Sequence, residues 1–406
     1  MTSAHEQINA TLVLPYLNHA VRMYEQKYAS RADIDAAMRF GCGYPRGPLT
    51  TLDEIGLDVV RDQLAARYAE TSDNLHKPAD LLESLVAEGR TGKAAGRGFY
   101  SYDGGEIVAD DETPGADDKP SLRHEIAKVG VVGTGTMAAG IVQVFAQAGY
   151  DVVFVGRSDE KASAVVAGIT KSLDKLIEKG KLTEDDKSDV VERLIASTER
   201  EALGDVDIVV EAIAEDLDVK LELFADLDRI CKPGAILATT TSSLPITQLA
   251  NATGRPESVI GMHFFNPAPV MKLVEVVTTE LTADDVDETT KALCASVGKV
   301  AVSCGDRAGF IVNALLFPYL NDAVKLSETG VVITEIDEAI KAEAGFPMGP
   351  FQLLDVVGND VSLAIQKELF AEFKEPGFAP AAALEKVVAD GHLGRKTKRG
   401  FHDYSA

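Results

Sequence analysis

The chain contains no tryptophan and only four cysteines, and no apolar run approaches the length of a membrane-spanning helix. The cysteines have no CxxC spacing, so we expect reduced thiols and a cytoplasmic protein; they are Cys42, Cys231, Cys294 and Cys304. The first residues lack the basic and apolar regions of a signal peptide. The sequence therefore favours neither a disulfide scaffold nor a membrane protein, and it predicts no metal site.

Basic residues are also scarce. The sequence has 40 Lys and Arg against 64 Asp and Glu, a net charge of −24, which disfavours nucleic acid and anionic membranes as partners. An anionic ligand must then be bound by local cationic patches. The length of 406 residues, with 46% hydrophobic and 26% charged residues, predicts a globular protein of two or three domains.

One stretch of the chain occurs twice. Residues 12–25 (LVLPYLNHAVRMYE) match residues 315–328 (LLFPYLNDAVKLSE) at an offset of 303. Residues 43–48 (GYPRGP) match residues 345–350 (GFPMGP) at an offset of 302. The shared register continues to Tyr102 and Tyr404, so one helical domain is present in two copies.

The segment between the copies divides into a linker and an alternating strand–helix pattern. Residues 104–125 are acidic and rich in Pro and Gly, which predicts a solvated linker. From Ile126 onward, apolar strands alternate with helices, which predicts a doubly wound, mainly parallel α/β sheet. The predicted domains are 1–103 (helical), 126–309 (dinucleotide-binding) and 310–406 (helical).

A glycine turn lies at the start of the α/β region. The strand ending at Val132 runs into Gly133-Thr134-Gly135, and Thr136 and Met137 open a helix. Gly133 permits the tight turn, and Gly135 lets the backbone approach a pyrophosphate that binds the helix N-terminus. A single motif of this kind also occurs in ordinary turns, but the flanking strands favour a nicotinamide dinucleotide site.

The end of the second strand of this region favours NADP(H) over NAD(H). An NAD site usually has an acid there for the ribose 2′-hydroxyl, whereas this chain has Gly156, Arg157 and Ser158. A guanidinium and a hydroxyl can bind a 2′-phosphate. In the alternative interpretation, Arg157 is a solvated loop residue and Asp159 takes the role of the acid, so that NAD(H) is the cofactor.

Several stretches closely resemble the L-3-hydroxyacyl-CoA dehydrogenase family: GTGTMAAGI, VVEAIAED, TSSLPIT, HFFNPAPVMKLVEVV and DRAGFIVNALLFPYLNDAV. The resemblance implies a Rossmann domain followed by a helical domain, with the active site between them. It assigns His263 as the base, Glu275 as the acid that orients it, and Ser242 and Asn313 as residues that hold the substrate. The residues themselves agree, because imidazole suits proton transfer near neutral pH and a carboxylate in an apolar strand needs a partner.

The resemblance also implies residues that bind the cofactor and coenzyme A. It places Glu215, Lys220, Asn266 and Lys396 near the cofactor, and Ser172 and Lys179 at coenzyme A. Lys171, Lys175 and Lys179 would share one helical face, which could gather phosphates. Each residue has an alternative as a helix cap, a turn residue or a solvated charge, and the catalytic residues could individually be structural.

The first copy serves as an internal control, because Asn313 aligns with Ala10 and Asn9 lies one place away. We therefore expect no second active site there. In the family, subunits dimerise largely through their helical domains, so we expect the two copies to pack as an internal pseudo-dimer; an appended domain with an unrelated contact is the alternative. Further association between chains is left open.

The predicted activity is interconversion of a short-chain (S)-3-hydroxyacyl-CoA, such as 3-hydroxybutyryl-CoA, and its 3-oxoacyl-CoA, as in β-oxidation. One alternative is a related hydroxy-acid dehydrogenase that acts without coenzyme A, such as a sugar-acid oxidoreductase of the crystallin-like branch. Another is a cofactor-binding structural protein that has lost catalysis.

Overall fold

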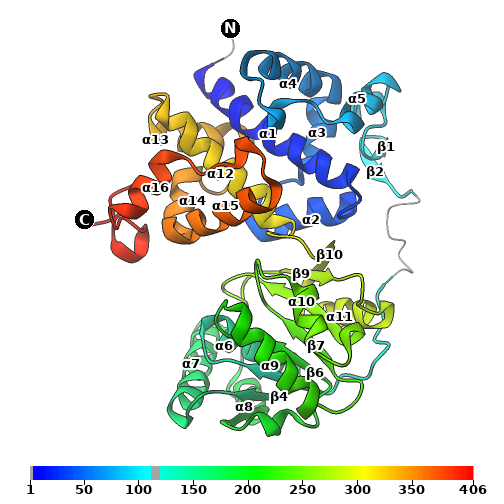
Figure 1. The fold of residues 1–406 in the computed structure, drawn as a ribbon, viewed down its shortest axis with the longest axis vertical. Helices are drawn as coiled ribbons and strands as arrows, with labels where there is room; N and C mark the ends of the chain where they lie inside the picture. The colour runs from blue at the N-terminus through cyan, green and yellow to red at the C-terminus, as the bar shows by residue number, and fades with distance from the viewer. Residues whose placement is uncertain (1–2, 111–118, 406) are drawn as a thin grey trace. The chain divides into compact units, whose positions relative to one another are not determined.

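The computed structural model describes residues 3–110 and 119–405. The chain divides into two compact units (Figure 1). The helical unit comprises Met1–Gly115 and Ala308–Ala406, and the α/β unit comprises Ala116–Arg307. Residues 111–118 of the predicted linker lie outside the described residues.

The α/β unit contains an eight-stranded sheet in the order β10-β9-β8-β7-β6-β3-β4-β5. All neighbouring strands are parallel except β8 and β9, which are antiparallel. The strands are β3 (Lys128–Val132), β4 (Asp151–Val155), β5 (Leu194–Ser197), β6 (Ile208–Glu211), β7 (Ile236–Thr239), β8 (Val259–Phe264), β9 (Leu273–Thr278) and β10 (Val300–Gly305). This arrangement confirms the predicted doubly wound, mainly parallel sheet.

The central strands are short apolar runs because helices cover both of their faces. Val129, Val131, Ile208 and Val210 are fully buried. The order places β3 between β6 and β4, the point at which a doubly wound sheet opens a crevice at the carboxyl ends of its strands. The helices are α6 (Thr136–Gln147), α7 (Asp159–Glu178), α8 (Glu184–Glu192), α9 (Leu217–Ile230), α10 (Ile246–Asn251) and α11 (Asp284–Ser296), with short helical turns η3 (Arg200–Leu203) and η4 (Pro256–Ser258).

The helical unit contains the two copies, whose elements correspond one to one. The first copy consists of α1 (Ala4–Glu25), α2 (Arg31–Cys42), α3 (Pro48–Ile55), α4 (Leu57–Thr71), η1 (Asn74–His76), α5 (Asp80–Ala87) and η2 (Lys93–Ala95). The second consists of α12 (Val312–Glu328), α13 (Ile333–Ala339) with the π-turn η5 (Ile340–Ala344), α14 (Pro350–Val357), α15 (Asn359–Phe373), η6 (Pro376–Phe378), α16 (Ala382–Ala389) and η7 (Arg395–Thr397).

The two copies pack against each other within this unit. Helix α1 (blue) lies against α12 (yellow) and α13 (Figure 1). Tyr44 stacks on Phe346, with ring centroids 3.6 Å apart and planes 7° apart. Tyr16 and Tyr319 meet at a centroid distance of 6.0 Å. Each of these pairs joins equivalent residues of the two copies, to within one position of the register.

The structure corrects the predicted ends of the linker. Strand β1 (Ser101–Asp103) forms a hairpin with β2 (Glu106–Val108), so the first copy continues past residue 103. Asp110 forms an ion pair with the buried Arg31 of α2. At the other end, the backbone amides of Arg123 and His124 donate to Thr289 of α11, so residues from Ser121 onward belong to the α/β unit.

The sequence did not predict β5 or β10, and it began β9 three residues too early, at Val270 instead of Leu273. The four cysteines are free thiols. Within residues 3–110 and 119–405, no helix combines the length and the apolar character needed to cross a membrane.

Candidate active site

The turn between β3 and α6 has the geometry of a dinucleotide site. Gly133 has φ of 131°, and an added Cβ would collide with the carbonyl oxygen of Ala212. A Cβ on Gly135, in contrast, would meet only open space. Glycine is therefore required at the first position for the backbone, while the second leaves room for a ligand to approach the N-terminus of α6.

A cavity of about 750 Å³ opens at this turn. Gly133, Gly135, Thr136 and Met137 line it, as the sequence predicts, together with residues that follow β4, β5 and β6. Its size is within the range of cofactor-binding clefts. The open position at Gly135 and the free space above the helix N-terminus fit a dinucleotide pyrophosphate.

The residues after β4 differ from one another in their surroundings. Arg157 is exposed and lines the cavity. The Ser158 hydroxyl accepts a hydrogen bond of 3.3 Å from the amide of Lys161 and caps α7. Ser158 therefore has a structural role as a helix cap, which was not among the predicted alternatives for this residue. Asp159, the alternative acid, lies in the first turn of α7 and is not among the residues that line the cavity.

His263 and Glu275 meet across the antiparallel pair β8–β9, where they are directly opposite each other. Nδ1 of His263 lies 2.7 Å from Oε2 of Glu275. The glutamate is fully buried and the histidine is 8% exposed. The predicted contact is therefore present, and it defines the orientation of the imidazole and makes Nε2 the ring atom for proton exchange with a substrate.

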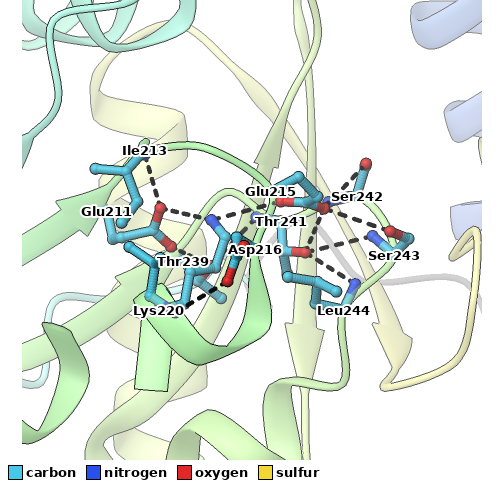
Figure 2. A network of polar contacts seen from close by, with 11 residues as sticks. Glu211, Ile213, Glu215, Asp216, Lys220, Thr239, Thr241, Ser242, Ser243 and Leu244 are labelled. Atoms are coloured by element: carbon cyan, nitrogen blue, oxygen red, sulfur yellow. Dashed lines mark hydrogen bonds and ion pairs between the residues drawn. The ribbon is translucent and has the colours of Figure 1, made fainter. Parts of the chain in front are cut away.

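Ser242 lies in the turn after β7 and is held by Glu215 (Figure 2). Oε1 of Glu215 accepts the backbone amide of Ser242 at 2.8 Å and the hydroxyl of Thr241 at 2.6 Å. It also lies 3.3 Å from the Ser242 hydroxyl. Burial raises the pKa of Glu215, but the hydrogen bond from Thr241 and the charge of Lys220 outweigh it and hold this pKa below its usual value. The ionised carboxylate thus shapes the serine turn.

Lys220 is completely buried, and its ammonium lies between Glu211 and Glu215 (Figure 2). Its Nζ is 2.6 Å from Oε1 of Glu211 and 3.5 Å from Oε2 of Glu215. The Thr239 hydroxyl donates to the other oxygen of Glu211 at 2.6 Å. Two carboxylates around one ammonium satisfy the buried charges. The observed role of Lys220 is to join Glu211 to Glu215; a direct contact with the cofactor stays a prediction.

Ser242 and His263 come from neighbouring parallel strands. β7 pairs with β8, with Thr239 opposite Gly261, so the serine turn and the histidine lie at the same carboxyl edge of the sheet. Asn266 follows β8 in an exposed turn and precedes Pro267 through a cis peptide bond. The buried ammonium of Lys299 donates to the carbonyls of Ala268 (2.6 Å) and Met271 (2.7 Å), and so anchors the loop after Asn266.

The remaining predicted residues lie elsewhere. On α7, Ser172 is half-buried, whereas Lys171, Lys175 and Lys179 are exposed on the side opposite the buried Leu173. Asn313 and Lys396 belong to the helical unit. Asn313 is half-buried in the first turn of α12, and Lys396 forms an ion pair with Asp360 at 2.6 Å.

Sequence reasoning missed four residues that shape the site: Glu211, Thr241, Lys299 and Arg200 of the crevice. Glu211 had a signal, because it is a carboxylate in the apolar run IVVEAI, and the same argument identified Glu275. Thr241 also had one, because it is the first residue of the family stretch TSSLPIT. Lys299 and Arg200 had none, since their partners are distant in the sequence.

Comparison with known proteins identifies the family. The chain matches the 3-hydroxyacyl-CoA dehydrogenase NAD binding domain over residues 128–307. It matches the C-terminal domain of the same family twice, over residues 8–102 and 309–404. The double match agrees with the internal repeat.

Individual relatives support the same family assignment. The chain is 44% identical to 3-hydroxybutyryl-CoA dehydrogenase of Clostridioides difficile over 279 residues, 68% of this chain and 99% of the relative. It is 43% identical to the enzyme of that name in Mycobacterium tuberculosis over 286 residues, 70% of this chain and 100% of the relative. The crystal structure of (S)-3-hydroxybutyryl-CoA dehydrogenase from Ralstonia eutropha is similar with a TM-score of 0.68 at 42% identity, and the match covers 70% of this chain and 100% of that one. This chain therefore belongs to the 3-hydroxyacyl-CoA dehydrogenase family.

Proposed function

We propose that this protein interconverts a short-chain (S)-3-hydroxyacyl-CoA and the corresponding 3-oxoacyl-CoA, with NADP(H) as the preferred cofactor. The observation that carries the proposal is the buried His263–Glu275 pair, at the same edge of the sheet as the serine turn. Relatives of more than 40% identity are named 3-hydroxybutyryl-CoA dehydrogenase, which supports the acyl-CoA substrate.

In this proposal, each side chain has a defined task. Nε2 of His263 takes the proton of the substrate hydroxyl during oxidation and returns it during reduction. Glu275 holds Nδ1 and stabilises the imidazolium that forms. The hydroxyl of Ser242 donates to the reacting oxygen, in a turn that Glu215 holds in place. A bound nicotinamide supplies the hydride chemistry. The assignment of Asn313 to the substrate rests on its place in the family motif.

The cofactor assignment rests on the crevice. Gly133, Gly135, Thr136 and Met137 would hold the pyrophosphate, with Asn266, Glu215 and Lys220 toward the nicotinamide half. Gly156 stands where an NAD site carries its acid and is followed by Arg157 and Ser158, so a 2′-phosphate is favoured over a free 2′-hydroxyl. Ser172 and the exposed lysines of α7, in particular Lys179, would bind the phosphates of coenzyme A.

An assay of acetoacetyl-CoA reduction tests this function. We expect turnover with NADPH at a higher kcat/KM than with NADH, and a loss of roughly 10²- to 10⁴-fold in His263→Ala. Thermal unfolding of the variant checks that it is folded. Activity that survives the substitution, or activity on free hydroxy acids but not on acyl-CoA substrates, would contradict the proposal.

We further propose that the two helical copies pack as partner subunits would. Contacts between them are reciprocal: Gly43 lies against Pro347, and its equivalent Gly345 lies against Pro45, the equivalent of Pro347. Contacts in which residue i of one copy meets residue j of the other, and j meets i, are typical of a two-fold interface. Because this surface is used within one chain, we expect no pairing of chains through it. A dimer that dissociates in Tyr44→Ala, measured by sedimentation, would contradict this.

A further inference from the structure

Two arginines line the nucleotide end of the crevice. β4 and β5 are parallel neighbours with Val155 opposite Ser197, so the residues that follow leave the sheet at the same edge. Arg157 follows β4 by two residues and Arg200 follows β5 by three, and both line the cavity. In the part of the chain that the structure describes, no carboxylate lines it.

The two arginines differ in their exposure and in their ion-pair partners. Arg157 is exposed, whereas Arg200 is half-buried at the start of η3 and forms an ion pair with Asp226 of α9. This pair restrains the guanidinium, which presents five donors in a rigid plane. An exposed guanidinium and one restrained by an ion pair, both lining the same cavity, are suited to a phosphate dianion, which offers several acceptor oxygens.

Thr134 blocks the position where an NAD site carries its acid. A Cβ built on Gly156 would lie 2.7 Å from Cγ2 of Thr134, which is closer than real Cβ contacts. The β-branched threonine has few rotamers with which to move away. A side chain at position 156 therefore requires a change at position 134, and the two positions are coupled.

We propose that Arg157 and Arg200 together form the site for the 2′-phosphate of NADP(H), and that Thr134 keeps this site free of a carboxylate by excluding any side chain at position 156. This inference rests on the proposed cofactor preference. It adds Arg200 and Thr134 as residues that determine cofactor specificity.

Binding of 2′,5′-ADP and 5′-AMP, measured by calorimetry without substrate or turnover, tests the arginine site. We expect the wild type to bind 2′,5′-ADP at least tenfold more tightly than 5′-AMP. Arg157→Ala and Arg200→Ala should each weaken 2′,5′-ADP binding by about 10- to 100-fold, because each removes charge-assisted hydrogen bonds. Binding of 5′-AMP should change by less than about twofold. Arg193→Ala is the matched control, since Arg193 pairs with Asp151 at the opposite ends of β4 and β5.

The outcomes separate the two proposals. If the wild type shows no preference for 2′,5′-ADP, the proposed NADP(H) preference is wrong. If the preference is present but Arg200→Ala leaves it unchanged, the cofactor proposal stands and the two-arginine site is wrong.

A second set of variants tests Thr134. Thr134→Ser removes only the interfering methyl group, and we expect it to leave the melting temperature unchanged. Gly156→Asp alone should lower the melting temperature, whereas Thr134→Ser/Gly156→Asp should recover it and bind 5′-AMP more tightly than 2′,5′-ADP. If Gly156→Asp alone is as stable as the wild type, Thr134 does not exclude a side chain there and this part of the inference fails.

Discussion

The two helical copies share their hydrogen-bonded framework but differ at the start of their first helices, α1 and α12. In the first copy, Asp53 accepts the amides of Phe99 and Tyr100; in the second, Asp355 accepts those of Phe401 and His402. Equivalent asparagines, Asn18 and Asn321, tie the first helix to the loop before the last helix. The framework therefore depends on the same buried polar residues in both copies.

The difference lies at Ala10 and Asn313, which align. Helix α1 begins at Ala4, so Ala10 lies in its second turn. Helix α12 begins at Val312, because Gly309 and Phe310 before it have φ of 76° and 46° and break the helix. Asn313 is thus in the first turn of its helix. A duplicated domain can keep its fold without the local geometry of a functional site, because fold and site depend on different residues.

The largest expected effect is on kcat/KM, and it concerns the difference between Ala10 and Asn313. Asn313→Ala should lower kcat/KM by about 100-fold, equivalent to about 3 kcal/mol, if its amide holds the substrate in the transition state. Asn9→Ala, the nearest asparagine of the first copy, should leave kcat/KM unchanged. Steady-state kinetics with acetoacetyl-CoA measures both. Equal losses in the two variants would show that the first copy contributes to catalysis.

The next effect concerns the shared framework. Asp53→Ala and Asp355→Ala should each lower the free energy of unfolding by about 3 kcal/mol, because each leaves two backbone amides at buried or half-buried residues without an acceptor. Urea unfolding monitored by circular dichroism measures the loss. Glu54→Ala is the control, because Glu54 is an exposed neighbour of Asp53 on α3 that pairs with Arg46. A large loss in only one copy would mean that the copies do not share their framework.

The titration of two equivalent carboxylates also separates the copies. Burial raises the pKa of Asp35 to about 6 from 3.8, and hydrogen bonds from Thr50 and Leu49 oppose this only in part. Burial also raises the pKa of Asp337, but the hydrogen bond from His402 opposes it. At the position of His402 the first copy has Tyr100, whose hydroxyl donates to Asp35 at 3.0 Å.

A carboxylate whose pKa is raised on folding binds more protons in the folded state than in the unfolded state. The stability contributed by Asp35 is therefore fully present below pH 3.8 and is lost as the pH rises through about 6. Tyr100→His places an imidazolium beside Asp35. If it lowers this pKa by about one unit, the loss becomes smaller by about 1.4 kcal/mol. His402→Tyr should act in the opposite direction on Asp337. Unfolding curves between pH 4 and 7 measure both, and parallel curves for wild type and variants would contradict the assignment.

Much of the fold was predictable because its signals are local. Buried parallel strands are apolar runs, the glycine turn needs a residue with positive φ, and the repeat is visible as identical words at one offset. β5 and β10 were missed because they lie at the two edges of the sheet, where Ile195 is exposed and the burial of Val300–Gly305 alternates incompletely. The hairpin β1–β2 was missed because both strands have only three residues and Glu106–Val108 is exposed, so it buries no apolar face.

The residues of the candidate site also divide into those with a local signal in the sequence and those without one. His263 and Glu275 were predictable because both lie in a family motif and a carboxylate in an apolar strand needs a partner. The antiparallel register that places them opposite each other is seen only in the structure. Arg200 and Lys299 were not, because a basic residue in a loop acquires meaning only from what the fold brings to it. For Arg200 that is the end of β4, and for Lys299 it is the pair of carbonyls after Pro267.

The smallest expected effect tests whether the copies, although alike, fold as one body. The ring of Tyr44 lies flat on that of Phe346, and each ring comes from a different copy. Stacked aromatic pairs contribute about 0.5–1.5 kcal/mol beyond their buried area. A double-mutant cycle of Tyr44→Leu and Phe346→Leu should therefore give a coupling energy of about 1 kcal/mol in a single unfolding transition of the helical unit. A coupling near zero, or two separate transitions that respond to one variant each, would mean that each copy is stable alone and that their contact adds little. A clear coupling would mean that the second copy, which carries Asn313, depends for its stability on a first copy that has alanine at the equivalent position.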